Sequence, residues 1–301
     1  MKNAILLYGN LKSFKDDPLY KHEESYLNFL LHIKKFLVDV NDCDVFMITS
    51  YMHDYEVGGG RFIFNEKTSD TVKKNIKKIF GDKLQYLCIT DEDEDYKKEE
   101  EKMSQITKKE LAVLFNRLKE ENPTIQEFQK EWDEDAIAKS YMFPRNFFYN
   151  FKLFKLFETI RDKDYDKILS FRPDLNLQRI LYFKDFDPKF VNGWNVINCF
   201  LTSKENIEKI TEYIFHMGDY QAIYKTHPIY AFHSERNLTT FTDTLGIGRG
   251  CGFFAEYILY HGTRRYNPEF LLQMDKKIEE FFDLEITNEN LDVFLSKDFL
   301  S

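Results

Sequence analysis

The segment Lys167–Leu177 (KILSFRPDLNL) places charged side chains directly after an apolar run. The run through Phe171 is typical of a buried strand, and in an open α/β sheet ligands bind beyond the carboxyl ends of the strands. Asp174 could therefore ligate Mg²⁺ or Mn²⁺, which prefer hard oxygen ligands, with the amide oxygen of Asn176 as a second donor. Arg172 could bind a phosphate group. Alternatively, Arg172 and Asp174 form only an ion pair with each other at the strand end.

Two acidic residues are candidates for general-base catalysis, provided that they lie in the same cleft. Asp219 begins a predicted helix, and Glu256 lies in a predicted helix that follows a glycine-rich stretch. Either carboxylate could take the proton of an acceptor hydroxyl in an inverting transfer. Acids on helices are also common as solvated groups or as partners of the helix N-terminus, and that interpretation stays open.

Other glycine-rich and acidic segments are weaker candidates for a phosphate-binding or metal site. The stretch 246–252 (GIGRGCG) could cradle a phosphate with its backbone amides, but its spacing is not G-x-G-x-x-G. We favour a mobile loop in which glycine permits close backbone approach. The literal D-x-D strings within Asp91–Asp95 lie in a charge run and predict no metal site. Asp185–Asp187 precedes a proline and is favoured as a turn over a metal corner.

Alternating strands and helices must position these residues. Such alternation implies parallel βαβ units, and we therefore predict an α/β fold with a mostly parallel sheet flanked by helices. Strands are predicted at Ala4–Tyr8, Val45–Thr49, Leu84–Ile89 and Lys167–Phe171, helices at 26–40, 72–80 and 147–160, and shorter strands at Ile180–Phe183, Val196–Leu201 and Tyr213–Met217.

The predicted organisation is one catalytic domain and a tail. Residues 1–262 form the domain, which carries a helical insertion at about 91–140 that serves as a surface decoration or as a lid. Residues 263–301 form a helical tail packed on the domain.

Composition narrows the class of protein. With 42 Lys+Arg against 51 Asp+Glu, the net charge is -9, and no basic block indicates a nucleic-acid partner. The 4 cysteines show no C-x-x-C spacing, which argues against a disulfide framework or a zinc site. No apolar run is long enough for a signal peptide or a transmembrane segment, so we expect a cytoplasmic protein. The oligomeric state is not indicated.

Several motifs together resemble a group of GT-A-type glycosyltransferases of surface-polysaccharide and glycan synthesis. In that group the first strand ends in a Gly-polar-hydrophobic-basic turn, and an R-x-D-like motif replaces the D-x-D of the wider fold. The matching segments are ILLYGNLKSF (5–14), DVFMIT (44–49), YDKILSFRPDLNL (165–177), HMGDYQAIY (216–224) and AEYILYHG (255–262). The resemblance covers roughly residues 1–50 and 140–262.

The resemblance implies a GT-A-like, Rossmann-like fold and the transfer of a sugar from a UDP- or GDP-linked donor to a glycan or other hydroxyl acceptor. Asp174 would hold Mn²⁺ or Mg²⁺ on the diphosphate, and Asp219 or Glu256 would face the acceptor. The residues implied at the nucleotide and its leaving group are Gly9, Asn10, Lys12, Ser13 and Arg172. The chain departs from the group at Lys12, where Arg is frequent, and at Ala255, where Pro is usual.

Two alternatives remain open beside the glycosyltransferase. One is a non-catalytic protein that binds a nucleotide or a glycan on the same fold. The other is a phosphotransferase or nucleotidyltransferase, which would release phosphate or pyrophosphate instead of a nucleoside diphosphate.

Overall fold

The computed structural model divides the chain into two compact units. The first unit contains residues 2–91, 171–185 and 254–301, and the second contains residues 92–170 and 186–253. Within them the structure describes residues 2–11, 26–50, 52–53, 62–63, 66–121, 123–124, 131–139, 143–177, 180–196, 199–215, 242, 245–250, 258–259 and 286–296.

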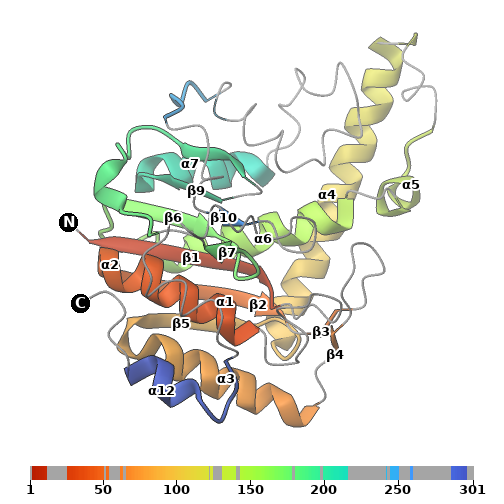
Figure 1. Ribbon diagram of the computed structural model, residues 1–301. Helices are drawn as coiled ribbons and strands as arrows, with labels where there is room; N and C mark the ends of the chain where they lie inside the picture. Colours follow the sequence, from red (N-terminus) through yellow and green to blue (C-terminus); the bar gives the residue numbers. More distant parts are fainter. Residues whose placement is uncertain are drawn as a thin grey trace. The chain divides into compact units, whose positions relative to one another are not determined.

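Three parallel strands form the centre of the first unit (Figure 1). Strand β1 (Asn3–Asn10) pairs along its whole length with β2 (Cys43–Ser50), and β2 pairs with β5 (Leu84–Ile89). The chain connects β1 to β2 through α1 (Tyr26–Ile33), a π-helical turn over Lys34–Val38 and α2 (Asp39–Asn41). It connects β2 to β5 through α3 (Glu66–Phe80) and a 3₁₀ turn over Gly81–Lys83. Parallel neighbours require such helical crossovers.

The burial of these elements follows from their sequences. The apolar run of β1 is buried from Ala4 onward, as is typical of a central parallel strand covered on both faces. All eight residues of α1 are buried, whereas the described side chains of α3 bury an apolar stripe at Val72, Ile76, Ile79 and Phe80 together with Asn75. Gly81 follows α3 in the left-handed region with φ +56°, as is common for a glycine at the C-terminal end of a helix.

Short elements complete the described part of the first unit. Strands β3 (Met52–His53) and β4 (Phe62–Ile63) pair antiparallel, as do β7 (Asn176–Leu177) and β10 (Ile258–Leu259). A 3₁₀ turn covers Phe183–Asp185. Helix α12 (Leu291–Ser296) belongs to the predicted tail and lies beside α3, where Lys78 pairs with Asp292 at 2.5 Å (Figure 1).

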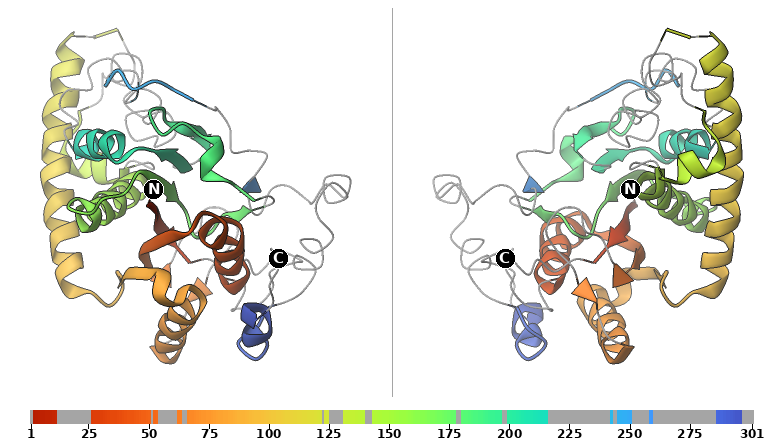
Figure 2. Two further views of the ribbon diagram at one scale, coloured as in Figure 1. Left: turned by 90° about the vertical axis from the view of Figure 1, so that its left-hand side faces the viewer. Right: turned by 90° about the vertical axis from the view of Figure 1, so that its right-hand side faces the viewer.

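Helices dominate the second unit. Its long helix α4 (Glu94–Glu121) lies beside α6 (Phe143–Ile160), and α6 also contacts α7 (Lys204–Phe215) (Figure 2). Helix α5 (Glu134–Lys139) packs on the C-terminal half of α4, where the rings of Phe115 and Trp132 meet edge to face at 5.1 Å. The sequence of α6 repeats Phe147, Phe151, Phe154, Phe157 and Ile160 at helical spacing, which predicts a core-facing stripe. All of these residues are buried except Phe154, which is half-buried.

Six strands form the main sheet, in the order β5-β2-β1-β6-β9-β8. Its remaining members are β6 (Lys167–Phe171), β8 (Asn192–Val196) and β9 (Cys199–Thr202). Strand β9 runs antiparallel to both β6 and β8, so the sheet is mixed. The predicted α/β class with a mostly parallel sheet flanked by helices is confirmed, and the four principal strands lie where the apolar runs predict them.

The three shorter strand predictions were wrong in their limits or their type. Residues 180–182 lie outside any strand, and a 3₁₀ turn begins at Phe183. The predicted strand at 196–201 is divided between the end of β8 and most of β9. Tyr213 lies in α7, because the spacing of the buried Ile207, Ile210 and Thr211 follows a helical period that continues through the apolar run.

Candidate functional site

The carboxyl ends of β1, β2 and β5 lie in register at one edge of the first unit. Gly9 and Asn10 at the end of β1 pair with Thr49 and Ser50 at the end of β2, and Thr49 pairs with Ile89 of β5. The ladder continues one step further on each side, from Leu11 N to Ser50 O at 2.9 Å and from Thr90 N to Thr49 O at 2.9 Å. Two residues of the predicted nucleotide turn, Gly9 and Asn10, therefore border this edge.

Gly9 has a backbone conformation that suits only glycine. Its φ is +134°, which lies in a region that side chains with a Cβ rarely adopt. A residue with a Cβ would therefore be strained at this position. The glycine of the predicted turn is needed for this backbone conformation, whatever binds there.

Hydroxyl and carboxylate groups line the ends of β2 and β5. Ser50 Oγ donates a hydrogen bond of 3.0 Å to Asp91 Oδ1. Thr49 is fully buried, and its hydroxyl has no hydrogen-bond partner in the part of the chain that the structure describes. A buried hydroxyl without a partner is costly, and each such group in a folded protein calls for an explanation.

Sequence reasoning missed Thr49, Ser50 and Asp91. The residues of the charge run that contains Asp91 have different roles. Asp91 follows β5 in the first unit, whereas Asp93 in the second unit caps α4 by accepting a 2.9 Å hydrogen bond from Tyr96 N. The signal that could have found these residues is their place at the carboxyl ends of strands. Thr49 and Ser50 end β2 as Gly9 and Asn10 end β1, and Asp91 follows two residues after β5.

Arg172 and Asp174 form a buried bidentate ion pair directly after β6. Arg172 Nε donates to Asp174 Oδ1 at 2.9 Å, and Nη2 donates to Oδ2 at 2.7 Å. Arg172 is 3% exposed and Asp174 is 0% exposed. The ion pair, which the sequence left open as an alternative, is therefore present.

The donor set at Asp174 does not fit a divalent cation. Both carboxylate oxygens already accept guanidinium hydrogens, and the positive charge of Arg172 opposes a second cation beside them. Asn176, the second predicted ligand, lies in β7, and its side chain is outside the described residues. Within the described ranges, no three His, Cys, Asp or Glu side chains gather where they could hold a metal ion.

The other predicted site residues lie outside the described residues. These are Lys12 and Ser13 of the first turn and the candidate bases Asp219 and Glu256. The predicted roles of these four residues stay predictions. The helix predicted around Glu256 is wrong at Ile258–Leu259, which form β10. Of the predicted set, the structure brings Gly9 and Asn10 together at one strand end and joins Arg172 to Asp174.

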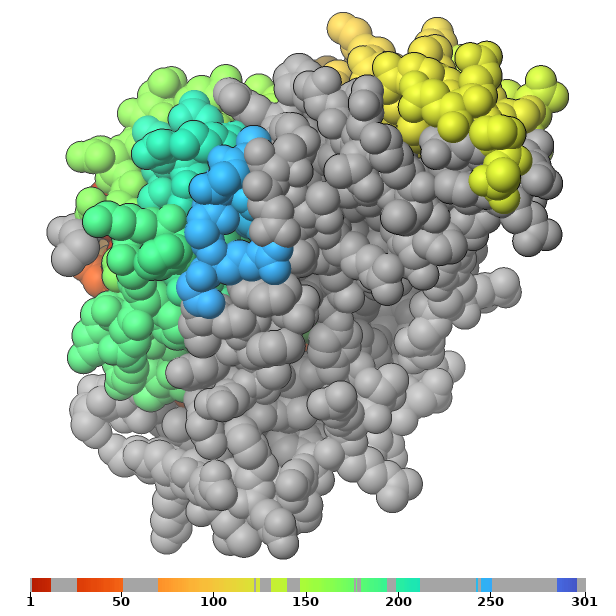
Figure 3. All heavy atoms as spheres, turned by 90° about the horizontal axis from the view of Figure 1, so that it is seen from above, coloured from red at the N-terminus to blue at the C-terminus, as the bar shows by residue number. Residues whose placement is uncertain are grey.

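Gly248 and Gly250 of the glycine-rich stretch serve backbone packing in the second unit. Residues 245–250 lie against the chain around Val191 (Figure 3), with Val191 N donating to Gly248 O at 3.0 Å and Gly250 N donating to Val191 O at 3.1 Å. A Cβ on Gly250 would lie 2.1 Å from Asn192 Oδ1. The amide of Gly250 is thus already bonded to the backbone at Val191. This favours the interpretation that glycine permits close backbone approach and disfavours a phosphate cradle.

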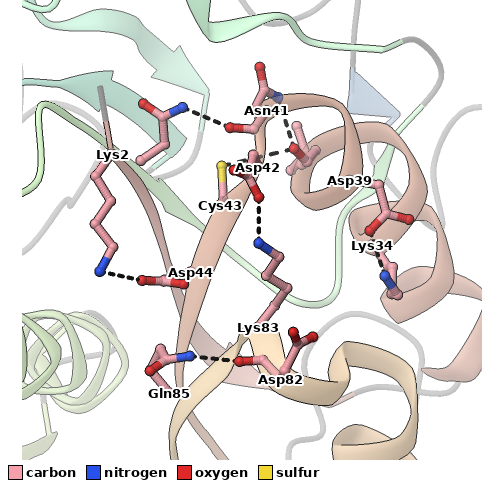
Figure 4. Close-up of polar contacts among 12 residues, drawn as sticks. Lys2, Lys34, Asp39, Asn41, Asp42, Cys43, Asp44, Asp82, Lys83 and Gln85 are labelled. Carbon is pink, nitrogen blue, oxygen red and sulfur yellow. Dashed lines mark hydrogen bonds and ion pairs between the residues drawn. The ribbon is translucent and has the colours of Figure 1, made fainter.

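The opposite, amino-terminal edge of the first unit is built from ion pairs and amide contacts (Figure 4). Lys83 pairs with Asp42, and Lys2 pairs with Asp44 at 3.0 Å. The hydrogen bond from Lys83 lowers the pKa of Asp42, and the same contact raises the pKa of Lys83. Burial raises the pKa of the Cys43 thiol, which makes that thiol unreactive. This edge therefore contributes to stability.

Comparison with family models and with curated proteins identifies no relative of this chain. No family model matches the sequence, and no curated protein matches it. Among the described residues, every helix is too short or too polar to cross a lipid bilayer.

Proposed function

We propose that this chain is a glycosyltransferase that moves a sugar from a UDP- or GDP-linked donor to a glycan or other hydroxyl acceptor. The observation that carries the proposal is the row of polar groups at the ends of β1, β2 and β5, and above all the buried Thr49 hydroxyl that lacks a partner among the described residues. Nucleotides bind in open α/β sheets at this edge, beyond the carboxyl ends of the strands.

The chemistry of the row suits the nucleoside part of such a donor. The Asp91 carboxylate accepts hydrogen bonds, as the ribose hydroxyls and the N–H groups of a base require, whereas it repels a phosphate. The hydroxyls of Thr49 and Ser50 both donate and accept, so they can serve either partner. The diphosphate would then lie toward the basic turn that begins at Gly9 and contains Lys12.

The proposed transfer breaks the bond between the sugar C1 and the diphosphate oxygen and forms a bond from C1 to the acceptor oxygen. In an inverting transfer the acceptor proton passes to a carboxylate, for which Asp219 and Glu256 are the candidates. Cationic side chains at the diphosphate would offset the charge of the leaving group, and Arg172 and Lys12 are the candidates for that role. No step is assigned to a metal, because the donor set at Asp174 does not fit one.

The test is the binding of UDP and GDP to the wild type and to Thr49→Val, measured by calorimetry. Valine keeps the shape of threonine and removes only the hydroxyl, so the variant should be as stable as the wild type or up to about 1 kcal/mol more stable. If the hydroxyl contacts the nucleotide, binding should weaken about 5- to 10-fold.

The matched control is Thr211→Val in α7. Thr211 is also fully buried, but its hydroxyl already donates to Ile207 O at 2.8 Å. The control should lose stability and leave nucleotide binding unchanged. Absence of UDP and GDP binding in the wild type would refute the proposal, and binding without turnover across a panel of sugar donors and acceptors would favour the non-catalytic alternative.

A further inference from the structure

The acid of the R-x-D-like motif has a different role from the one that the resemblance implies. We propose that Asp174 is a positioning residue: its carboxylate holds the guanidinium of Arg172 at the end of β6 and does not ligate a metal. As a statement about the donor corner of the proposed glycosyltransferase, the inference rests on that function. As a statement about Asp174, it rests on the contacts of the pair alone.

The geometry of the pair leaves Asp174 little capacity for a cation. The two hydrogen bonds of 2.9 and 2.7 Å join Nε and Nη2 to separate carboxylate oxygens, which is the strongest arrangement for this pair. Because both oxygens of Asp174 accept from Arg172, a cation could ligate them only by displacing the guanidinium. It would also meet the guanidinium charge at close range, where repulsion is weakly screened.

The sequence position of the pair explains what it does for the fold. Arg172 and Asp174 are two residues apart on the turn between β6 and β7, and Leu175 N donates to Arg172 O across the same turn at 3.4 Å. The buried ion pair therefore stabilises the conformation of this turn. An arginine offers five N–H donors in a fixed plane, and only two of them are used by Asp174. The pair thus sets the direction of the whole guanidinium.

The experiment compares Asp174→Asn, Arg172→Met and the double variant Arg172→Met/Asp174→Leu in the full chain. Thermal unfolding is measured in EDTA and in MnCl₂, and Mn²⁺ binding is measured directly by electron paramagnetic resonance. UDP and GDP binding is measured under both conditions. The control is Asp44→Asn, which removes an acid of the same type from its partly exposed pair with Lys2.

A counter-ion and a metal ligand give opposite results. If Asp174 is the counter-ion, Asp174→Asn lowers the melting temperature far more than Asp44→Asn does, and the double variant recovers much of the loss because no buried charge is left alone. Mn²⁺ binding is then the same in the wild type and Asp174→Asn, and the ratio of nucleotide affinities in Mn²⁺ and in EDTA does not change.

The inference is overturned if Asp174→Asn removes a Mn²⁺ site or abolishes the Mn²⁺ dependence of nucleotide binding. It is also overturned if the double variant is as unstable as the two single losses combined. Should the wild type bind neither nucleotide, the proposed function fails, but melting and Mn²⁺ binding still decide the role of Asp174. Failure of one proposal is therefore distinguishable from failure of the other.

Discussion

Substitution of Gly250 by alanine should damage the second unit through a single side chain, Asn192. A Cβ at this position would lie 2.1 Å from Asn192 Oδ1 and 2.9 Å from its Cγ, both closer than real Cβ contacts. Asn192 cannot move away cheaply, because it is 3% exposed and its Nδ2 donates to Asp187 O at 2.9 Å. The added methyl group must therefore push Asn192 out of its hydrogen bonds or separate the two backbone segments.

The magnitude follows from these two costs. Overpacking a filled site costs about 1–3 kcal/mol, and loss of a buried amide hydrogen bond costs about 1–3 kcal/mol. Because relaxation of one strain relieves part of the other, we expect Gly250→Ala to lower the free energy of unfolding by about 2–4 kcal/mol. The hydrogen bond from Gly250 N to Val191 O would be strained as well.

Two neighbouring glycines provide matched controls. A Cβ on Gly248 would lie 2.7 Å from Cδ1 of Phe190, but that ring is 40% exposed and can rotate away, so Gly248→Ala should cost under about 1.5 kcal/mol. Gly246 has open space around its Cα but a φ of +65°, so alanine there should cost about 1 kcal/mol through backbone strain alone.

Urea denaturation of the three variants, followed by circular dichroism, tests the ranking. We also expect Asn192→Ser combined with Gly250→Ala to be less harmful than the sum of the two single changes, since the smaller side chain leaves room for the methyl group. The reasoning is refuted if Gly250→Ala is no more destabilising than Gly248→Ala, or if the double variant is strictly additive.

Three further predictions concern the amino-terminal edge of the first unit. Asn41→Ala should lower the free energy of unfolding by about 2–3 kcal/mol, because Asn41 Nδ2 donates to Leu181 O at 2.8 Å and its Oδ1 accepts from Phe183 N at 2.7 Å. Equal stability of the wild type and the variant in urea would contradict this prediction. Since the folded-state pKa of Asp42 lies below its ordinary value of 3.8, the pair with Lys83 should stabilise the fold above pH 3.8 and lose that contribution as the pH falls through the folded-state pKa. The acid limb of the stability curve should therefore be shallower in Asp42→Asn, and an unchanged limb would count against the pair. Because burial raises the pKa of Cys43, iodoacetamide at about pH 8 should not alkylate it before unfolding, and rapid native labelling found by mass spectrometry would show the thiol to be accessible.

The principal strands were predictable because each has a strong local pattern. Ala4–Tyr8 and Lys167–Phe171 are apolar runs bounded by turn residues, and such runs indicate buried strands without knowledge of their partners. The run at Tyr213 was misread, because a short apolar segment has the same appearance in a buried helix and in a strand. Periodicity over the whole of α7 resolves that ambiguity, and five residues do not.

The candidate site was predictable only in part. Gly9 and Asn10 were found because they follow a clear strand, whereas Asp91 was dismissed because its neighbours are charged. Whether an acid in a charge run is a solvated group or a strand-end group depends on where the strand before it lies in the sheet. That is a property of pairing between distant segments, and here β2 must lie beside β5 before Ser50 can reach Asp91.

The sequence by itself determined the α/β class, the positions of the principal strands along the chain and the residue types available at their ends, because hydrophobic period and turn chemistry are local. The tertiary structure decided what those residues do to one another. In the sequence Asp174 could ligate a metal or pair with Arg172, and only the buried geometry after β6 joins both of its oxygens to one guanidinium. In the stretch that could cradle a phosphate, Gly248 and Gly250 likewise serve backbone packing, because their hydrogen bonds depend on where the chain at Val191 passes.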